Sequence, residues 1–383
     1  MQRSAYVTGW GVCLPNGPVS NDKIEAVLGK LQSQPESVKR AVLKVNGIAT
    51  RHYAIDPATG EMTHTNAQLT VEAIRNLCRN SDFSPNDIQC LACGTSIADQ
   101  MIPGHASMVH AELNCPPCEI IGTSGVCCSG VSALKYGFLS VAAGACDNAV
   151  VTGSELASPS LRASHFNEQT RPLRNQPEEH PTLPFSNAFL RWMLSDGAGA
   201  LLISATKPAA ALALRIDWVD LVSFASESET CMYFGMRKRE DGKFEGYRTV
   251  DDAGALLRDG YLSLAQDVRI LNERLPPLAK AAMQRTMQRR GLVASDVDWL
   301  LPHYSSQWFR QQLWDGLGDI GFNLPVDRWF TNLSTKGNTG SAAVYIMLEE
   351  LMTSGKVHAG QRILCMVPES SRMNFGFAHF TVV

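Results

Sequence analysis

Short apolar runs and stretches with helical periodicity alternate along the chain, and the same order of these segments occurs twice. A helical stretch over 66–79 is followed by an Asp-Ile pair, an apolar run and a polar turn within 84–96. A helical stretch over 278–290 is followed by an Asp-Val pair, an apolar run and a polar turn within 294–305. A period of 3.6 residues indicates a helix, and a short apolar run between turn residues indicates a buried strand. Each block therefore predicts a helix followed by a strand.

A second pair of blocks follows the first pair at matched spacing. In each, a loop rich in Gly, Ser and Thr leads into a helical stretch and then an apolar run. Asp87 lies 41 positions before Cys128, and Asp296 lies 42 positions before Asn338. Two strand–helix halves in the same order predict an α/β fold with internal pseudo-symmetry. The predicted elements are helices over 129–143 and 339–352, and strands over 148–152 and 362–367.

The repeat divides the chain into an N-terminal half, residues 1–205, and a C-terminal half, residues 206–383. Near the boundary, the segment 157–190 is polar, rich in proline and mixed in charge. It is too long for an ordinary connection, so we expect it to cover a pocket or a partner. An apolar strand is predicted to follow a glycine turn within 191–204.

Composition excludes several classes of protein. The 383 residues include 34 Lys and Arg against 37 Asp and Glu, and 45% of them are apolar. Such a chain can bury a large core, and its near-neutral charge gives no support for nucleic-acid binding. No apolar run approaches the roughly 20 residues that span a bilayer, and the first residues lack a signal-peptide pattern. We therefore expect a cytoplasmic protein with no membrane or nucleic-acid partner.

The eleven cysteines are scattered, which argues against a disulfide framework. Two pairs, Cys90 with Cys93 and Cys115 with Cys118, have the spacing of a zinc ribbon. The first pair, however, falls in a predicted strand, in which its two side chains point to opposite faces. We therefore expect buried structural cysteines and no metal site.

The first Gly/Ser/Thr-rich loop places a cysteine at the start of a helix. Cys128 starts this predicted helix, where unpaired N–H groups and the helix dipole favour a thiolate. This makes Cys128 a candidate nucleophile. The adjacent Cys127 is the competing candidate, because only one of two neighbouring residues can face a given pocket. The alternative role for either is a small buried residue that packs the loop.

Two further candidates lie in the C-terminal half. His303 ends a predicted strand, where it can act as a general base or a hydrogen-bond donor. Asn338 offers an amide donor to an oxyanion or enolate oxygen at the start of the second helix. A structural histidine and a helix-capping asparagine are the alternatives. Pseudo-symmetry would bring a thiol, an imidazole and an amide to one central point, which suits acyl transfer from a thioester followed by carbon–carbon bond formation.

These motifs resemble those of the thiolase superfamily, in its ketoacyl synthase III-like branch. The resemblance implies a five-layered αβαβα fold, a homodimer and a Cys128–His303–Asn338 triad. It also implies an oxyanion hole made by the N–H groups of Cys128 and Gly376. Substrates would be carried on the phosphopantetheine of an acyl carrier protein or of coenzyme A, with no bound cofactor. The segments that carry the resemblance are Cys128-Ser-Gly130, Ser195-Asp-Gly-Ala-Gly-Ala200, Pro302-His303, Gly337-Asn338-Thr339 and Asn374-Phe-Gly-Phe377.

Several features depart from the ketoacyl synthase III pattern. The histidine is followed by Tyr-Ser-Ser, the C-terminal loop has one glycine, and Glu155 stands where many relatives carry a shorter or neutral side chain. Together with segments 46–54, 189–196 and 231–233, these features resemble the bacterial ketosynthase/cyclases of dialkylresorcinol and stilbene pathways. Those enzymes join a β-ketoacyl thioester to an α,β-unsaturated acyl thioester by Claisen and Michael steps, which gives a cyclohexanedione carboxylate. This chemistry needs a base, for which Glu155 is a candidate; a salt bridge or a dimer contact is its alternative role.

Other activities stay open at this point. A decarboxylative ketoacyl synthase III that uses malonyl thioester, or an ester- or amide-forming acyltransferase, would use the same fold. A catalytically silent subunit and a zinc-dependent interaction module are alternatives from other classes. An acidic carrier protein would require a basic rim on the enzyme. The candidates for that rim are Arg285, Arg289 and Arg290, on one helical stretch with Lys280, and Arg310; a solvated helix face is the alternative.

Overall fold

The computed structural model describes the whole chain apart from residues 1–2, 33–34, 168–186, 210 and 240. Most of the predicted excursion, 168–186, lies outside the described residues. The α-helices are α1 (Ile24–Leu28), α2 (Glu36–Asn46), α3 (Asn66–Arg79), α4 (His105–Leu113), α5 (Cys128–Ala143), α6 (Ala163–Asn167), α7 (Ala253–Arg258), α8 (Val268–Arg290), α9 (Trp308–Gly318), α10 (Leu333–Lys336) and α11 (Ala343–Thr353). The strands are β1 (Tyr6–Cys13), β2 (Val19–Ser20), β3 (Thr50–Arg51), β4 (Cys90–Thr95), β5 (Glu119–Ser124), β6 (Asn148–Glu155), β7 (Gly197–Ser204), β8 (Leu214–Ser223), β9 (Met232–Tyr233), β10 (Met236–Lys238), β11 (Phe244–Gly246), β12 (Ala265–Gln266), β13 (Trp299–Pro302), β14 (Arg362–Glu369) and β15 (Asn374–Val382).

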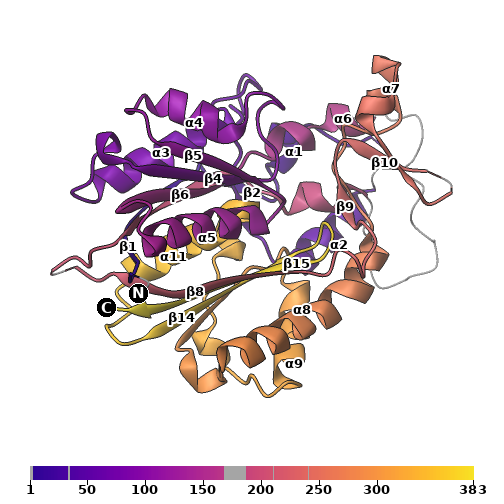
Figure 1. The fold of residues 1–383 in the computed structure, drawn as a ribbon. Coiled ribbons are helices and arrows are strands. Elements are labelled where there is room, and N and C mark those ends of the chain that lie inside the picture. Colours follow the sequence, from indigo (N-terminus) through magenta and orange to yellow (C-terminus); the bar gives the residue numbers. More distant parts are fainter. Residues whose placement is uncertain (1–2, 33–34, 168–186, 210, 240) are drawn as a thin grey trace.

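One large sheet contains nine strands in the order β5–β4–β6–β7–β1–β8–β15–β14–β13. Strands β1 and β8 join its two parts, and they pair only through Tyr6 with Arg215 and Val7 with Leu214. This short contact lets the two parts of the sheet lie face to face, one above the other (Figure 1).

The two parts of the sheet share one topology. In the first, β4 is parallel to β5 and β6, and β7 is antiparallel to β6 and β1. In the second, β13 is parallel to β14, and β15 is antiparallel to β14 and β8. Trp329 forms a parallel bridge to Leu300 of β13, in the position that β5 has beside β4. The repeated blocks of the sequence thus form repeated strand arrangements. The division into domains 1–205 and 206–383 stays a prediction, because one sheet runs through both.

Helices complete five layers in the order α, β, α, β, α (Figure 1). Helices α3 and α4 cover the outer face of the first sheet part, and α5 and α11 lie between the two parts. Helices α8 and α9 pack together on the outer face of the second part. Most side chains of α5 and α11 are buried, as expected for helices that are apolar on every side. The predicted five-layered α/β fold is therefore confirmed.

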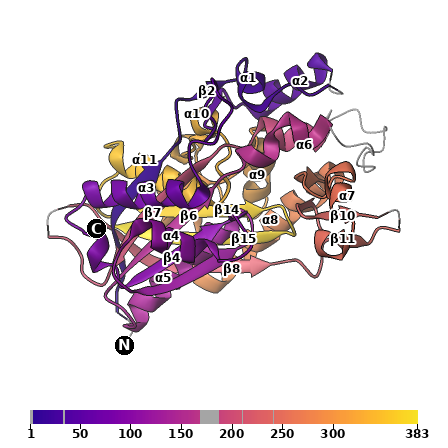
Figure 2. The same ribbon diagram turned by 90° about the horizontal axis from the view of Figure 1, so that it is seen from above.

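The segment between β8 and α8 forms a separate region at one end of the molecule. It contains β9, β10, β11, β12 and α7, and both views place it beside α6 (Figures 1 and 2). Two small antiparallel pairs, β10 with β11 and β9 with β12, hold this region together. We call it the β9–β12 region.

Helix α8 is longer than the sequence predicts. The predicted helix begins at residue 278, directly after Pro276 and Pro277. The structure instead begins α8 at Val268 and continues through both prolines. The Asp267 side chain caps this earlier start by accepting a hydrogen bond from the Ile270 N–H (3.0 Å). Among the described residues, no helix is both long enough and apolar enough to cross a membrane.

Gly130 of α5 allows a close contact with the second half of the fold. A Cβ on Gly130 would lie 2.3 Å from the Ser341 carbonyl oxygen, whereas one on Gly316 of α9 would meet nothing within 4 Å. We expect Gly130→Ala to lower the free energy of unfolding by about 1–3 kcal/mol, because α5 must move away. Gly316→Ala should leave that free energy unchanged or raise it by up to ~1 kcal/mol. Chemical denaturation measures both; equal stability of the two variants would contradict the close contact.

Candidate active site

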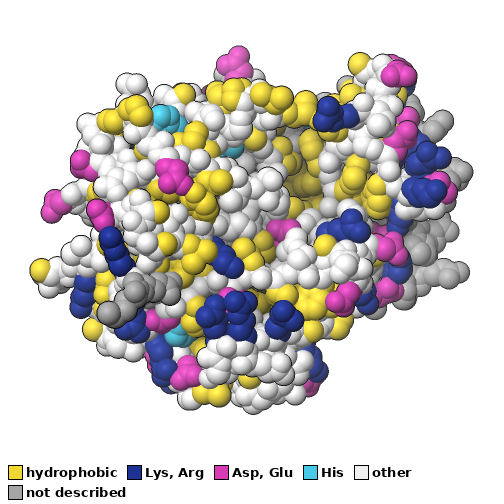
Figure 3. Space-filling model, viewed as in Figure 1, with side chains coloured by type: hydrophobic (Ala, Val, Ile, Leu, Met, Phe, Trp, Pro, Cys, Tyr) yellow, Lys and Arg dark blue, Asp and Glu magenta, His cyan; other side chains and the backbone are white. Residues whose placement is uncertain are grey.

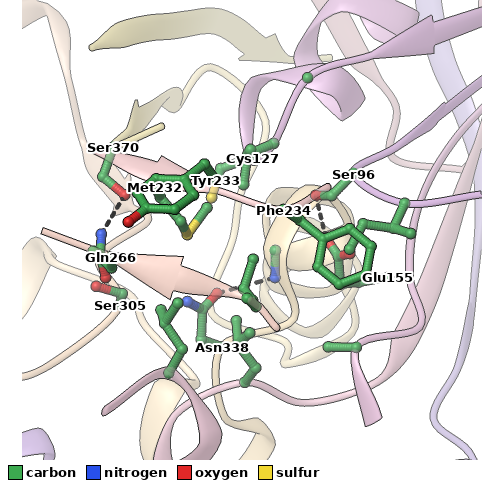
Figure 4. A pocket seen from close by; sticks show the side chains of 18 of the residues that line it. Ser96, Cys127, Glu155, Met232, Tyr233, Phe234, Gln266, Ser305, Asn338 and Ser370 are labelled. Carbon is green, nitrogen blue, oxygen red and sulfur yellow. Dashed lines mark hydrogen bonds between the residues drawn. The ribbon is translucent and has the colours of Figure 1, made fainter. Parts of the chain in front are cut away.

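A cavity of about 1090 Å³ lies where the two halves of the chain and the β9–β12 region meet. Polar side chains from strand ends and helix starts line it, among them Cys127, Glu155, His303 and Asn338. The rest of the lining is largely apolar and comes from β9, α8, α9 and neighbouring loops. Figure 3 shows the hollow with its hydrophobic side chains, and Figure 4 shows part of the lining from close by.

The two adjacent cysteines face different sides of their loop. Cys127 lines the cavity, whereas Cys128 is 5% exposed and its thiol donates to the Val367 carbonyl oxygen (3.3 Å). The N–H of Gly376 lies at the Cys128 thiol, and Gly376 pairs with Val367 inside the sheet. Neither Cys128 nor Gly376 is among the described residues that line the cavity. The predicted nucleophile Cys128 and the predicted oxyanion donor Gly376 therefore do not line the cavity with His303 and Asn338. Cys127, the residue before Cys128, lines it instead.

The structure does not favour the thiolate form of the cysteine that faces the cavity, Cys127. Burial raises the pKa of the Cys127 thiol well above its ordinary value, and the nearby Glu369 carboxylate raises it further. The N–H groups that would stabilise a thiolate already bind this carboxylate, because Glu369 accepts from the N–H of Val126 and of Cys128 (2.9 Å each). The resting thiol at Cys127 is therefore protonated at neutral pH.

His303 follows β13, and its imidazole has no hydrogen-bond partner among the described residues. Its position is fixed through the backbone, since its N–H donates to the Met366 carbonyl oxygen (2.8 Å). Burial lowers the pKa of this imidazole to about 4. A neutral imidazole in the cavity wall can accept a proton or donate one to a carbonyl oxygen.

Asn338 is held by its own backbone just before a 3₁₀ turn, Gly340–Ala342. Its N–H donates to the Met193 carbonyl oxygen (2.9 Å), and its carbonyl oxygen accepts from the Ser195 N–H (2.8 Å). The side-chain oxygen accepts from the Gly340 N–H (3.0 Å), which fixes the orientation of the amide (Figure 4). The side-chain nitrogen has no acceptor among the described residues, so its N–H groups are available to a ligand oxygen.

Glu155 ends β6 and is a buried carboxyl group in the cavity wall. One of its oxygens accepts from the Ser96 hydroxyl (2.6 Å; Figure 4). The same oxygen accepts from the Ser341 N–H (3.3 Å). Burial raises the pKa of Glu155 to about 7, although these hydrogen bonds act in the opposite direction. No ion pair holds Glu155 within the described part of the chain. A carboxyl group that titrates near neutral pH can take up and release a proton.

Glu369, which the sequence pattern does not single out, is 1% exposed and binds the N–H groups of the cysteine loop. A signal was present, because Glu369 ends β14 as Glu155 ends β6, at the corresponding place in the other half. Each of these carboxylates binds N–H groups at the helix start of the opposite half.

The predicted carrier-docking arginines lie at different distances from the cavity. Arg290 forms two hydrogen bonds to the Asp220 carboxylate (2.5 and 2.7 Å), and Arg289 approaches the same group (3.6 Å). This end of α8 lies about 15 Å along the helix from Lys280, which lines the cavity. Arg285 is exposed between these positions, and Arg310 lies in the first turn of α9 next to Phe309, a lining residue. A docking role for these arginines stays a prediction.

The cysteine pairs with zinc-like spacing are separated in the fold. Cys90 and Cys93 are buried on opposite faces of β4, in two different core clusters. Cys115 and Cys118 lie near His110 instead, with the potential ligand atoms of all three within 4.8 Å of one another. A four-cysteine ribbon is therefore incompatible with this structure, and the absence of a metal stays a prediction.

Two family models match this chain. The family model "Beta-ketoacyl synthase, N-terminal domain" matches residues 34–209, and "3-Oxoacyl-[acyl-carrier-protein (ACP)] synthase III C terminal" matches residues 287–367. A beta-ketoacyl-[acyl-carrier-protein] synthase III of Cereibacter sphaeroides is 25% identical over 94% of both chains. One from Streptomyces coelicolor is 25% identical over 95% of this chain and 93% of its own.

Solved structures show the same fold. AbyA1, a tetronic acid condensing enzyme, aligns with a TM-score of 0.76 and 20% identity over 98% of this chain and 99% of its own. OleA of Xanthomonas campestris aligns with a TM-score of 0.74 and 17% identity over 100% of both chains. The two family models together cover most of the sequence, one match containing both cysteines and the other containing His303 and Asn338. The chain therefore belongs to the thiolase superfamily, as a ketoacyl synthase III-like ketosynthase-type transferase.

Proposed function

We propose that this chain is a ketosynthase/cyclase that joins two acyl thioesters through an acyl group bound to Cys127. Its substrates are a β-ketoacyl thioester and an α,β-unsaturated acyl thioester, and its product is a cyclohexanedione carboxylate of the dialkylresorcinol or stilbene type. The observation that carries the proposal is the buried Glu155 carboxyl group in the cavity, with a pKa of about 7.

The first step is transfer of an acyl group to Cys127. The Cys127 sulfur forms a bond to the thioester carbonyl carbon, and the bond between that carbon and the carrier sulfur breaks. The thiol proton passes to the neutral His303 imidazole and then to the departing thiolate, which leaves as a free thiol. This order of events fits a cysteine whose thiol is protonated at rest.

The second step needs a carbanion, and Glu155 is well suited to form it. The carbon between the two carbonyl groups of a β-ketoacyl thioester is acidic, so a carboxylate can remove its proton. His303 and the free Asn338 amide donors would stabilise the enolate oxygen. The carbanion adds to the β-carbon of the unsaturated acyl group, and the α-carbon of that group takes the proton back from Glu155. A second deprotonation, at the carbon on the other side of the ketone, gives the carbanion for the Claisen step. This carbanion bonds to the carbonyl carbon of the formerly unsaturated thioester, the bond from that carbon to sulfur breaks, and the thiol leaves with the proton. Hydrolysis of the remaining thioester by water gives the carboxylate. A decarboxylative synthase generates its carbanion by loss of CO₂ and has no need of this base.

The size and character of the cavity support two acyl substrates. At about 1090 Å³ it lies at the upper end of the range for small-molecule sites. OleA, which shares the fold, was crystallised with lauric acid and lauroyl-CoA bound. The apolar walls formed by β9, α8 and α9 would bind alkyl or aryl tails.

A decarboxylative ketoacyl synthase III activity is the second candidate, because the curated relatives carry that name. An ester- or amide-forming acyltransferase would form no new carbon–carbon bond. Mass spectrometry of the products, with measurement of CO₂, separates these activities. Only malonyl-dependent condensation releases CO₂ in equal amount with its β-ketoacyl product.

Carrier-bound acyl thioesters are the proposed partners, with no bound cofactor and with a cytoplasmic location. A homodimer is part of the same proposal. Strand β5 forms an edge of the large sheet, and most of its residues are exposed or half-buried, with Ile120 37% exposed. An exposed apolar edge strand is suited to pairing with a second copy.

The adjacent cysteines provide a matched test of the nucleophile. After mixing with an α,β-unsaturated acyl-CoA or a β-ketoacyl-CoA, intact-protein mass spectrometry should detect one acyl adduct on wild type and on Cys128→Ala. Cys127→Ala should lose the adduct, because only residue 127 lines the cavity. An adduct that persists in Cys127→Ala but disappears in Cys128→Ala would assign the nucleophile to Cys128.

Glu155→Gln tests the base. We expect this variant to keep acylation of Cys127 and to lose cyclised product by about 10²- to 10⁴-fold. In wild type, kcat/KM for cyclisation should rise with pH through about 7, because only the ionised carboxylate accepts a proton. Unchanged cyclisation by Glu155→Gln, or a pH profile that is the same in both proteins, would remove Glu155 from the mechanism.

The raised pKa of Glu155 also predicts a pH-dependent cost in stability. Because the folded state raises this pKa from 4.5 to about 7, folding favours the protonated form, and stability falls as pH rises through this window. Glu155→Gln removes the titration, so its stability relative to wild type should improve between pH 4.5 and pH 7, by about 3 kcal/mol in total. Urea denaturation at pH 4.5 and pH 8 measures this; a constant difference would contradict the shift.

A further inference from the structure

Two carboxylates occupy corresponding places in the two halves, but only one faces the cavity. Glu155 lines the cavity and bonds the Ser341 N–H. Glu369 is not among the described lining residues, and it bonds the N–H groups on both sides of Cys127. The carboxylate at the end of the central strand therefore lines the cavity in the first half, and in the second half it binds the cysteine loop.

Each oxygen of the Glu369 carboxylate accepts two hydrogen bonds. One oxygen accepts from the N–H of Val126 and of Cys128 (2.9 Å each). The other accepts from the Ser371 hydroxyl and the Asn374 side-chain amide (2.7 Å each). A carboxylate accepts about four hydrogen bonds, so this one is fully satisfied and rigidly held. Such a group can fix its neighbours, but it has no free oxygen with which to act on a substrate.

These bonds leave one N–H of the loop available. The N–H groups of residues 126 and 128 are used by Glu369, whereas the Cys127 N–H lies at its own thiol and makes no bond to Glu369. The Cys127 residue itself lines the cavity. A thioester carbonyl beside the Cys127 sulfur would therefore find this N–H as an oxyanion donor.

We propose that Glu369 is the positioning residue of the nucleophile loop: it holds Val126 and Cys128 by their N–H groups so that the Cys127 residue between them faces the cavity. The Glu369 carboxyl group also lies close enough to the Cys127 thiol to disfavour a thiolate there before substrate binds. This inference rests on the proposed role of Cys127 as nucleophile. In this assignment, the Cys127 thiol reacts with a bound thioester because His303 accepts the thiol proton as the sulfur bonds to the carbonyl carbon. Toward other electrophiles the thiol is poorly reactive. The direction of the Cys127 pKa shift agrees with this assignment, since Glu369 is its largest electrostatic cause after burial.

The test compares two reactions of Cys127 that the proposal drives in opposite directions. Glu369→Gln removes the charge but keeps the shape and an acceptor oxygen. The rate of iodoacetamide alkylation of Cys127, followed by peptide mass spectrometry across pH, should then shift its midpoint down by on the order of one pH unit, about tenfold more alkylation at neutral pH. Acyl transfer from an acyl-CoA should meanwhile fall by about 10- to 100-fold in kcat/KM, because the loop is less firmly held.

Glu369→Asp provides the conservative control. It keeps the charge on a shorter side chain, so the alkylation midpoint should stay within a few tenths of a unit of wild type while acyl transfer slows. If Glu369→Gln fails to fold, as judged by circular dichroism, the Asp variant carries the test by itself: a lowered midpoint there would overturn the role of the charge. In folded Glu369→Gln, an unchanged midpoint or unchanged acyl transfer would overturn the proposal.

Failure of the proposed function is distinguished by a different result. If Cys127→Ala is still acylated, the nucleophile is another residue, and the loop held by Glu369 is not the nucleophile loop. If Cys127 is acylated in wild type but the Glu369→Gln profile matches wild type, the nucleophile stands and only the positioning role fails.

Discussion

The contact between two helix starts is the constraint on which this site depends. A Cβ at Gly130 or at Gly153 would lie 2.3 Å from the Ser341 carbonyl oxygen, so α5, β6 and the turn before α11 meet at a distance that only glycine permits. Because of this contact, the end of each central strand lies beside the helix start of the opposite half. Side chains that are far apart in the sequence, such as Glu155 and Asn338, thereby line one cavity.

Burial, rather than ion pairing, sets the protonation of the groups in that cavity. It lowers the pKa of His303 to about 4, raises that of Glu155 to about 7 and raises that of the Cys127 thiol well above its ordinary value. Each shift favours the uncharged form, as expected where water is largely excluded. At neutral pH the imidazole of His303 and the thiol of Cys127 are therefore uncharged before the reaction, and Glu155 is partly ionised. That arrangement suits chemistry in which thioesters must react with each other and not with water.

The repeat in the sequence predicted the architecture well, because it rests on the burial of apolar runs and on the matched spacing of the two halves. Apolar runs are buried as strands, and the matched spacing places each strand of the first half in the position that its counterpart has in the second half. It also predicted that strand ends and helix starts converge, and His303, Asn338 and Glu155 do line one cavity. The choice between Cys127 and Cys128 could not be predicted, because hydrophobic periodicity defines a helix but not the direction of the residue just before its first turn. The structure resolves that direction through contacts from β14, some 240 positions further along the chain.

In the proposed mechanism, the two carboxylates explain how one architecture would support both acyl transfer and proton abstraction. Glu369 meets four donors and has no oxygen left, so it can only hold the loop that carries Cys127. Glu155 meets two donors on one oxygen, and its other oxygen has no donor among the described residues. A carboxylate with an unsatisfied oxygen in a buried wall binds a proton more readily than a satisfied one. Fold symmetry thus places two carboxyl groups at corresponding strand ends. In the proposed mechanism, the number of hydrogen bonds that each accepts decides which one positions the nucleophile and which one is free to act as a base.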